Sequence, residues 1–192
     1  MNIINTIKDV DTQLFLFLNS KHNDFFDVVM YWFSNKITWI PLYIYFFFLA
    51  YKKVGNRVWL VAVAIALLIL LSDQLSVHAF KNVFLRYRPC HNLLILSKVH
   101  LLNGYCGGTY SFVSSHAANT FSLAMFLSLL FKNKIKNFTI FIFIWASLVS
   151  YSRIYSGVHY PSDVAVGAII GMGIAVVIFK IYQYANSRMD QK

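Results

Sequence analysis

Residues 58–77 read VWLVAVAIALLILLSDQLSV, an apolar run in which Asp73 is the first charged side chain. About 20 such residues suffice for a helix to cross the hydrocarbon core of a bilayer. The run therefore predicts a transmembrane helix. Polar groups are costly in lipid, so we expect Asp73, Gln74 and the nearby His78 to face the interior of a helical bundle and to help position Lys81.

The composition extends this prediction to most of the chain. Of the 192 residues, 58% are hydrophobic and only 12% are charged, whereas a soluble domain carries about 25% charged residues. The formal charge of +10 would suggest nucleic-acid binding in a soluble protein. Here most of the basic surplus lies at the ends of apolar runs, where it fixes membrane orientation. We therefore expect the bilayer, and no nucleic acid, as the partner.

Four further apolar runs predict an all-α, polytopic transmembrane bundle of five spans. They cover residues 37–51, 116–131, 138–151 and 164–184. The run at 37–51 could extend back through 25–33, and the two following runs are expected to continue past their apolar limits. The chain forms a single domain, 1–192.

The N-terminal segment predicts a different kind of helix. Within residues 1–24, apolar side chains recur at helical spacing up to Asn19, with charged and polar residues between them. The apolar positions are Ile3, Ile4, Ile7, Val10, Leu14, Phe17 and Leu18, and the polar ones are Lys8, Asp9, Asp11 and Gln13. This pattern is typical of an interfacial amphipathic helix, although a sixth span stays open.

The basic residues between the predicted spans indicate the sidedness. They group as Lys52, Lys53 and Arg57; Lys132, Lys134 and Lys136; and Lys180, Arg188 and Lys192. With five spans these three groups lie on one side, which the positive-inside rule makes cytoplasmic. Residues 81–115 and 152–163 then share the opposite side.

Those two outer segments contain three clusters of chemically active residues. The first runs from Lys81 to Arg88 and Pro89, the second is Ser114-Ser115-His116, and the third contains Arg153, His159 and Asp163. Each alone has an ordinary structural explanation: interfacial basic residues, a serine helix cap, and an aspartate at a helix start.

Together the clusters predict a phosphate-binding site. Lys81 and Arg88 are seven residues apart, two turns along nearly one helical face, and Pro89 should end that helix at Arg88. Arg153 adds a second planar guanidinium for phosphate oxygens. Ser114 and Ser115, with the free N–H groups of the following helix, form an anion site.

The histidines supply the covalent chemistry in this interpretation. His159 attacks phosphorus as a neutral imidazole, and Asp163 holds the other ring N–H and stabilises the developing positive charge. His116 protonates the leaving oxygen and later activates water to hydrolyse the phosphohistidine.

The motifs K-x6-R-P, S-x-H and S-R-x5-H-x3-D, in this order, resemble those of the type 2 phosphatidic acid phosphatase (PAP2) superfamily. The resemblance implies a helical-bundle phosphatase without a metal or other cofactor. It assigns phosphate binding to the residues at Lys81, Arg88, Ser114, Ser115 and Arg153, and catalysis to those at His116, His159 and Asp163. The second motif of the family usually reads P-S-G-H, whereas this chain has V-S-S-H at 113–116, which could alter how tightly phosphate is held.

The predicted outer loop contains both cysteines, Cys90 and Cys106. A disulfide is plausible in an oxidising compartment and would clamp the loop; two free thiols are the alternative. His91, Lys98 and His100 lie in the same loop, either as solvated polar residues or in contact with a substrate headgroup. A zinc site from the cysteines and histidines matches no compact ligand spacing. Asp24 and Asp27 are expected to start a helix.

We thus expect a phosphatase acting on a membrane lipid at the outer face of a bacterial cytoplasmic membrane. Undecaprenyl diphosphate and lipid A are the leading substrates, followed by phosphatidylglycerophosphate and phosphatidate. A lipid phosphotransferase and a non-catalytic lipid-binding relative are the alternatives.

Overall fold

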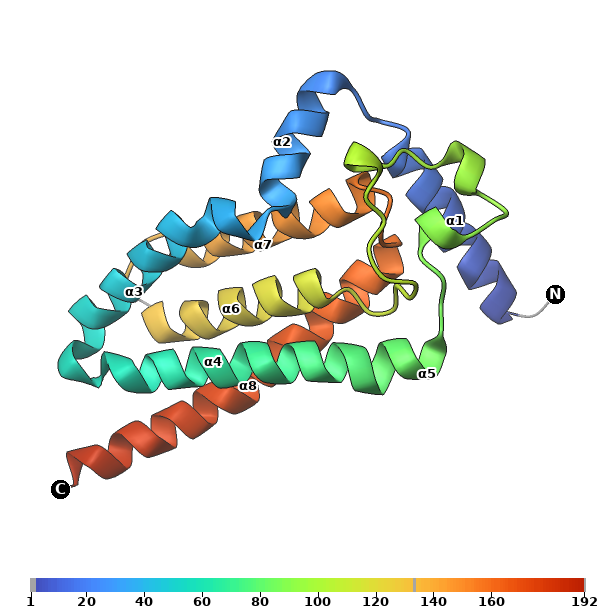
Figure 1. Ribbon diagram of the computed structural model, residues 1–192. Coiled ribbons are helices and arrows are strands. Elements are labelled where there is room, and N and C mark those ends of the chain that lie inside the picture. The colour runs from blue at the N-terminus through green and yellow to red at the C-terminus, as the bar shows by residue number, and fades with distance from the viewer. Residues whose placement is uncertain (1–2, 133, 192) are drawn as a thin grey trace.

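The computed structural model describes residues 3–132 and 134–191, without the side chains of Ile3, Ile4 and Asp190 (Figure 1). The longer helices are α1 (Ile3–Asn19), α2 (Asp24–Ser34), α3 (Ile40–Val54), α4 (Val58–Gln74), α6 (Ser115–Phe131), α7 (Phe138–Tyr155) and α8 (Pro161–Asp190). A π-helical turn, Leu75–Lys81, and the short α5 (Asn82–Phe84) continue α4. The described residues form no β-strand, only an isolated bridge between Tyr87 and Tyr110. The predicted all-α fold is confirmed. The side chains of Ile3 and Ile4, predicted as part of the amphipathic pattern, and Lys192, predicted as part of a basic group, lie outside the described part of the chain.

Three helical stretches are long and apolar enough to cross a membrane: Lys36–Phe84, Phe138–Tyr155 and Pro161–Met189. The apolar helix Ser115–Phe131 is shorter. The first stretch is a hairpin rather than one rod, because the chain reverses direction between α3 and α4 at Gly55, whose φ is +60° (Figure 1). A left-handed φ of this kind costs glycine little.

Helix α6 lies at the centre of the bundle and packs against α4, α7 and α8. Its most extensive packing is against α8, where two glycines allow the helices to approach closely. A Cβ atom at Gly171 would lie 2.1 Å from the carbonyl oxygen of Ala118, and one at Gly167 would lie 2.7 Å from that of Ser114. Small residues at such crossings are typical of membrane helices, which gain little from hydrophobic association in lipid.

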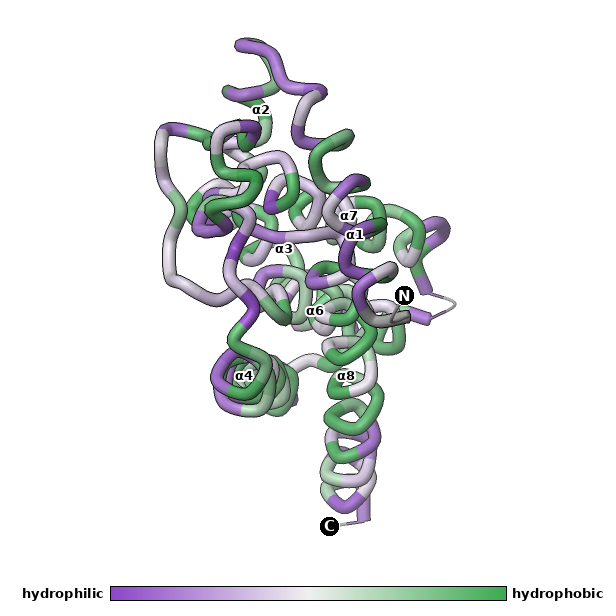
Figure 2. Tube along the Cα trace, turned by 90° about the vertical axis from the view of Figure 1, so that its right-hand side faces the viewer, coloured by the Kyte–Doolittle hydropathy of each residue, from purple (hydrophilic) through white to green (hydrophobic). Residues whose placement is uncertain are grey.

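The outward faces of the bundle are apolar. Ile140 and Ile144 on α7, and Ile169 and Val177 on α8, are all exposed. Figure 2 shows α8 hydrophobic over most of its length and more hydrophilic toward its C-terminal end. An exposed surface of this composition is suited to lipid rather than water.

The two ends of the bundle differ in what they contain. The α3–α4 turn, the α6–α7 connection and the C-terminal end of α8 lie at one end, and the 85–114 loop lies with the α7–α8 connection at the other (Figure 1). The basic groups and the three motifs are therefore at opposite ends of the described bundle, as the alternating topology predicts.

Helix α1 is docked on the protein through an unexpected face. Asp11, Phe15 and Asn19 are buried, whereas Val10 and Phe17 are exposed. Asp11, which the sequence pattern groups with the polar positions of this helix, is buried because its carboxylate accepts a hydrogen bond from Ser162 of the third motif. Ile7 and Leu14 are likewise exposed, so most of the described apolar positions are directed away from the protein, whereas Leu18 packs against a buried cluster.

Two other expectations fail, one about polar residues in α4 and one about the start of the first span. Gln74 and His78 are exposed, and only Asp73 of the three is partly buried; the π-helical turn that begins at Leu75 changes the helical register of His78. Residues 25–33 do not extend the first span, because α2 ends at Ser34 and Asn35 caps both α2 and the following turn. Asp24 does begin α2, as predicted.

Candidate active site

One cavity of ≈ 840 Å³ collects the predicted site residues at the loop end of the bundle. It is lined by Lys81, Arg88, Ser115, His116, Arg153 and His159. These side chains come from the π-helical turn, the 85–114 loop, the start of α6, the last turn of α7 and the α7–α8 connection. Ser114 and Asp163 are fully buried behind this lining.

Lys81 and Arg88 reach the cavity from different elements, so their predicted position on one helical face is wrong. The helix ends at Phe84, because Leu85 adopts a left-handed conformation with φ +48°. Arg88 itself is extended, as a residue before proline should be. Its guanidinium donates to the carbonyl oxygens of Tyr110 at 3.2 Å and Cys106 at 3.3 Å.

The second motif forms the start of α6. Ser114 is the N-cap, and its hydroxyl accepts a weak hydrogen bond from the N–H of Ala117 at 3.4 Å. Ser115 and His116 occupy the first turn, where helical N–H groups lack intrahelical acceptors. The Lys81 ammonium donates to the Ser115 hydroxyl at 2.9 Å, so a cation and a helix N-terminus meet at one point. That combination favours an anion.

Arg153 is buried and partly unsatisfied. It donates through one terminal nitrogen to the Ser34 hydroxyl of α2, while its Nε has no hydrogen-bond partner among the described residues. A guanidinium with a free donor in a cavity can bind a phosphate oxygen.

His159 and Asp163 form the predicted pair, at an ion-pair distance. The His159 Nδ1 atom lies 3.5 Å from Asp163 Oδ2, which is longer than a normal hydrogen bond. Burial lowers the pKa of His159 to about 4, Asp163 opposes this effect, and Arg88 and Arg153 add to it. The imidazole is therefore neutral near pH 7, as a nucleophile must be.

Asp163 has stronger partners than the histidine. It accepts a hydrogen bond from the backbone N–H of Tyr160 at 2.8 Å, which caps α8, and one from Arg86 at 3.0 Å. Arg86 also contacts Asp11 at 2.7 Å. Neither Arg86 nor Asp11 is a site residue predicted from the sequence. The signal available for Arg86 was its place between Lys81 and Arg88; for Asp11, no local pattern distinguishes it from Asp9.

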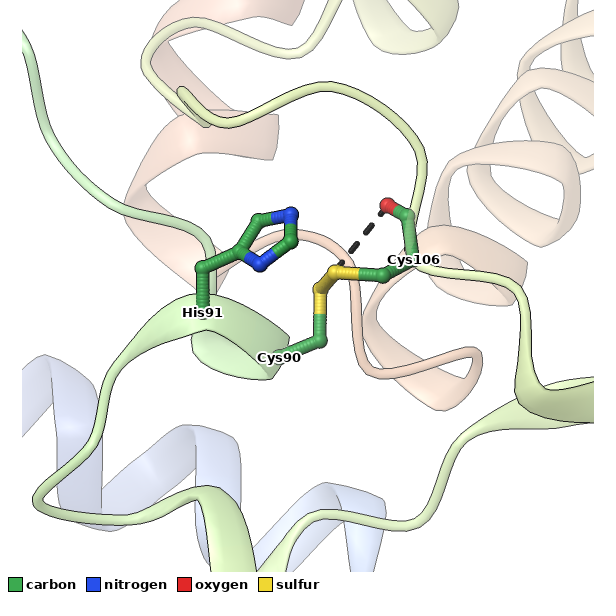
Figure 3. Close-up of side chains that lie close together, drawn as sticks. All are labelled: Cys90, His91 and Cys106. Carbon is green, nitrogen blue, oxygen red and sulfur yellow. Dashed lines mark hydrogen bonds between the residues drawn. A yellow bond between two sulfur atoms is a disulfide. The ribbon is translucent and has the colours of Figure 1, made fainter.

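The outer loop is closed by a disulfide between Cys90 and Cys106, with a Cα–Cα distance of 5.9 Å (Figure 3). His91 lies beside the two sulfur atoms. Both sulfurs are used in the bond, so no thiolate remains there to hold zinc. His100 is also not free for a substrate headgroup, because its Nε2 lies 2.9 Å from Asp27 and its ring stacks on His22.

Most of the remaining cavity wall is apolar and runs along the helices of the bundle, with Asp73, Asn119 and Thr120 as polar exceptions. Its lining includes Phe46 and Ala50 of α3, Val61 and Ile65 of α4, Leu127 of α6 and Trp145 of α7. One cavity thus joins a cationic end to a hydrocarbon-like end.

The sequence profile of the PAP2 superfamily matches residues 57–187, which contain all three motifs. The chain belongs to the PAP2 superfamily. It is 40% identical over 183 residues to the lipid A 4'-phosphatase of Porphyromonas gingivalis, covering 95% of this chain and 77% of that protein. It is 41% identical over 174 residues to the lipid A 4'-phosphatase of Bacteroides thetaiotaomicron, covering 88% and 75%.

The fold is similar to that in the crystal structure of Aquifex aeolicus LpxE. The TM-score is 0.64 at 26% sequence identity, over 88% of this chain and 94% of that one. The chain is thus a multi-pass membrane protein and a PAP2 lipid phosphatase, and its prediction as a hydrolase is confirmed.

Proposed function

We propose that this PAP2 phosphatase hydrolyses a phosphate ester of lipid A through a phosphohistidine at His159. The observation that supports this proposal is the single cavity in which Lys81, Arg88 and Arg153 adjoin an apolar channel. A phosphorylated lipid has the same division between a polyanionic headgroup and hydrocarbon chains.

A route from the bilayer into the channel is part of this proposal. Phe47 of α3 and Ala62 and Ala66 of α4 line the cavity and are nevertheless exposed. All three belong to the membrane-length stretch Lys36–Phe84. A lipid could therefore enter sideways between these helices without leaving the membrane.

Lipid A is favoured over other lipids by the relatives, two of which are lipid A 4'-phosphatases. Undecaprenyl diphosphate, phosphatidylglycerophosphate and phosphatidate are the competing substrates, and the assay below includes each of them.

In this proposal, the basic side chains of the cavity and the start of α6 bind the phosphate. Lys81, Arg88 and Arg153 surround the equatorial oxygens, whose charge is spread in the transition state. The Ser115 hydroxyl and the N–H groups of Ser115 and His116 add donors at the helix N-terminus. Ser114 supports them as the N-cap, since its own N–H donates to the Asp163 carbonyl oxygen.

The chemistry then proceeds in two displacements. Asp163 lies at the Nδ1 side of His159, so Nε2 is the nucleophile. Its lone pair forms the N–P bond as the P–O bond to the lipid breaks, and His116 gives its proton to the leaving oxygen. Water next attacks phosphorus, His116 takes the proton from water, and the N–P bond breaks to release inorganic phosphate. Asp163 stabilises the positive imidazole ring between the two steps.

The topology belongs to the same proposal. We assign five spans to α3, α4, α6, α7 and α8, with the basic connections in the cytoplasm of a bacterium and the cavity opening at the outer face of the cytoplasmic membrane. Cysteine labelling with a membrane-impermeant reagent tests this sidedness. Single cysteines are introduced in the 132–137 connection or at exposed Leu94, in a Cys90→Ser/Cys106→Ser background. Labelling of the 132–137 connection in intact cells would contradict it.

The activity test is phosphate release by purified protein in detergent from lipid A, undecaprenyl diphosphate, phosphatidylglycerophosphate and phosphatidate. We expect kcat/KM to be highest for lipid A and to be lost in His159→Ala, with the exposed His91→Ala as a matched control that retains activity. A higher kcat/KM for an isoprenyl or glycerol lipid would replace the proposed substrate, and normal turnover by His159→Ala would remove the proposed nucleophile.

Two additions to this assay examine the mechanism and the acceptor. Turnover should survive EDTA, since no step needs a metal, and vanadate should inhibit by adopting the five-coordinate geometry of phosphorus. Restoration by a divalent ion after EDTA inactivation would contradict the mechanism. Transfer of phosphate to an added acceptor lipid, instead of to water, would identify a phosphotransferase.

A further inference from the structure

A network of charged and polar residues lies behind the cavity and connects α1 to the third motif. Its members are Asp11 of α1, Arg86 of the outer loop, and Ser162 and Asp163 at the start of α8. Neither Asp11 nor Arg86 lines the cavity, so neither is placed to contact the substrate.

Arg86 bridges the two carboxylates with separate nitrogens. One terminal nitrogen lies 3.0 Å from Asp163 Oδ1 and 2.7 Å from the Ser162 hydroxyl. The other lies 2.7 Å from Asp11 Oδ2. The planar guanidinium therefore fixes the distance between two carboxylates that are 152 positions apart in the chain.

Asp11 also holds the first turn of α8 directly. Its Oδ1 accepts the backbone N–H of Ser162 at 2.9 Å, and its Oδ2 accepts the Ser162 hydroxyl. Helix α1 is thus bonded to the residue next to Asp163, and a shift of α1 would be transmitted to the His159 partner.

An aromatic contact fixes the same segment from its other side. The Arg86 guanidinium lies 3.8 Å from the centre of the Tyr160 ring. That ring packs edge-on against Phe15 of α1 at 5.4 Å, and its hydroxyl accepts a hydrogen bond from Asn92 at 3.1 Å. The residues on both sides of Pro161 are therefore held by α1 and the outer loop.

The charges in the network explain why two acidic residues are needed. Arg86 alone would neutralise Asp163 and weaken its stabilisation of a positive His159 ring. Asp11 balances Arg86, so the cluster keeps one net negative charge beside the imidazole while Arg86 keeps the carboxylate oriented.

We propose that Asp11 and Arg86 are positioning residues for phosphoryl transfer, which act on His159 through Asp163 and make α1 part of the catalytic unit. The inference rests on the proposed phosphohistidine chemistry. It assigns α1 a role beyond membrane contact.

The proposal predicts opposite electrostatic effects for the two residues. His159 faces Asp163 from α8, Arg88 from the outer loop, Arg153 from α7, and Lys81 and His116 across the cavity. With those groups unchanged, Arg86→Gln leaves two uncompensated carboxylates and should raise the pKa of His159 by about one unit. Asp11→Asn leaves no uncompensated carboxylate, because Arg86 then pairs with Asp163 alone, and it should lower the pKa of His159.

The double variant Asp11→Asn/Arg86→Gln restores the original net charge. The His159 pKa should therefore return to within about 0.3 units of the wild-type value, a non-additive result. Asp9→Asn is the matched control, since Asp9 is exposed on the same helix and its removal changes the net charge equally.

The experiment is an NMR titration of the histidine rings in detergent, with the His159 signal assigned by its loss in His159→Gln, together with kcat and KM for lipid A. We expect the opposite pKa shifts in the two single variants, and about tenfold lower kcat with unchanged KM in Asp11→Asn. Asp9→Asn should match the wild type in every measurement. Equal shifts in Asp9→Asn and Asp11→Asn, or an unchanged kcat in folded Asp11→Asn, would overturn the proposal. If wild-type protein releases no phosphate from any lipid, the proposed function fails, and the titrations alone then decide whether α1 acts on His159.

Discussion

The backbone N–H of Ser114 donates a hydrogen bond to the carbonyl oxygen of Asp163, with a nitrogen–oxygen distance of 3.0 Å. This bond joins the start of α6 to the first turn of α8. Since His116 lies two residues after Ser114 and His159 four before Asp163, the bond sets the relative position of the two histidines. It depends on the close approach of the two helices at Gly167.

Gly167→Ala should therefore impair catalysis. The added Cβ would lie 2.7 Å from the Ser114 carbonyl oxygen, a backbone atom that cannot move without displacing the helix. We expect a loss of stability of roughly 1–3 kcal/mol and at least tenfold lower kcat. Gly173→Ala is the control, because no neighbouring atom of the described residues lies within 4 Å of its added Cβ. This variant should keep full activity and melt no lower than wild type. Equal effects of the two substitutions on phosphate release would contradict this account of the helix crossing.

Reduction of the Cys90–Cys106 disulfide should loosen the phosphate site. The bond closes a loop across 16 positions, and the Cys106 carbonyl accepts a hydrogen bond from Arg88. The Cys90→Ser/Cys106→Ser variant should lose about 3 kcal/mol of stability and show a several-fold higher KM with a smaller change in kcat. Dithiothreitol should reproduce this effect in the wild type and leave the double variant unchanged. An unaltered KM in both cases would show that the loop does not position Arg88.

The acid limit of activity should lie well below the ordinary histidine range. Burial lowers the pKa of His159 to about 4, and the neutral ring present above that pKa is the nucleophile. Protonation of His159 should therefore reduce kcat/KM only when the pH approaches about 4. In Asp163→Asn the carboxylate that raises this pKa is gone, so this acid limit should move lower still while kcat decreases. A His159 titration near pH 6.5 in the unliganded protein would contradict the burial described for this ring.

The apolar channel should select for lipid substrates. Ala66 lines the cavity on α4 and is exposed. It belongs to the proposed lipid entrance, so Ala66→Trp should raise KM for lipid A about tenfold. A short, water-soluble phosphate monoester does not need the channel, and its kcat/KM should be unchanged. Leu67→Trp, at an exposed neighbouring position outside the lining, is the control. Equal inhibition with both substrates would place the lipid chains elsewhere.

Much of the fold could be predicted from the sequence because membrane helices are specified locally. Apolar runs of sufficient length mark α4 and α8, and the basic residues at Lys52 and Lys132 mark the turns between helices. Pro89 correctly predicts that Arg88 is not helical, although the helix ends earlier than predicted, at Phe84. These features need no knowledge of distant contacts.

The errors arise where a distant contact or a local backbone change decides the outcome. The left-handed Leu85 and the π-helical turn before it alter the direction of the helix around Lys81, and neither has a strong signal in residue type. Asp11 looks like one acidic residue on a polar face, yet its partners Arg86 and Ser162 are far away in the chain. No single sequence carries that pairing.

The central claim is a covalent phosphate on His159, and rapid acid-free quenching during turnover of a ³²P-labelled lipid tests it most directly. The account predicts label on the protein that is stable in alkali, labile in acid, located on His159 by peptide mapping, and absent in His159→Ala. Turnover at the wild-type rate by His159→Ala, or label on a residue other than His159, would contradict it.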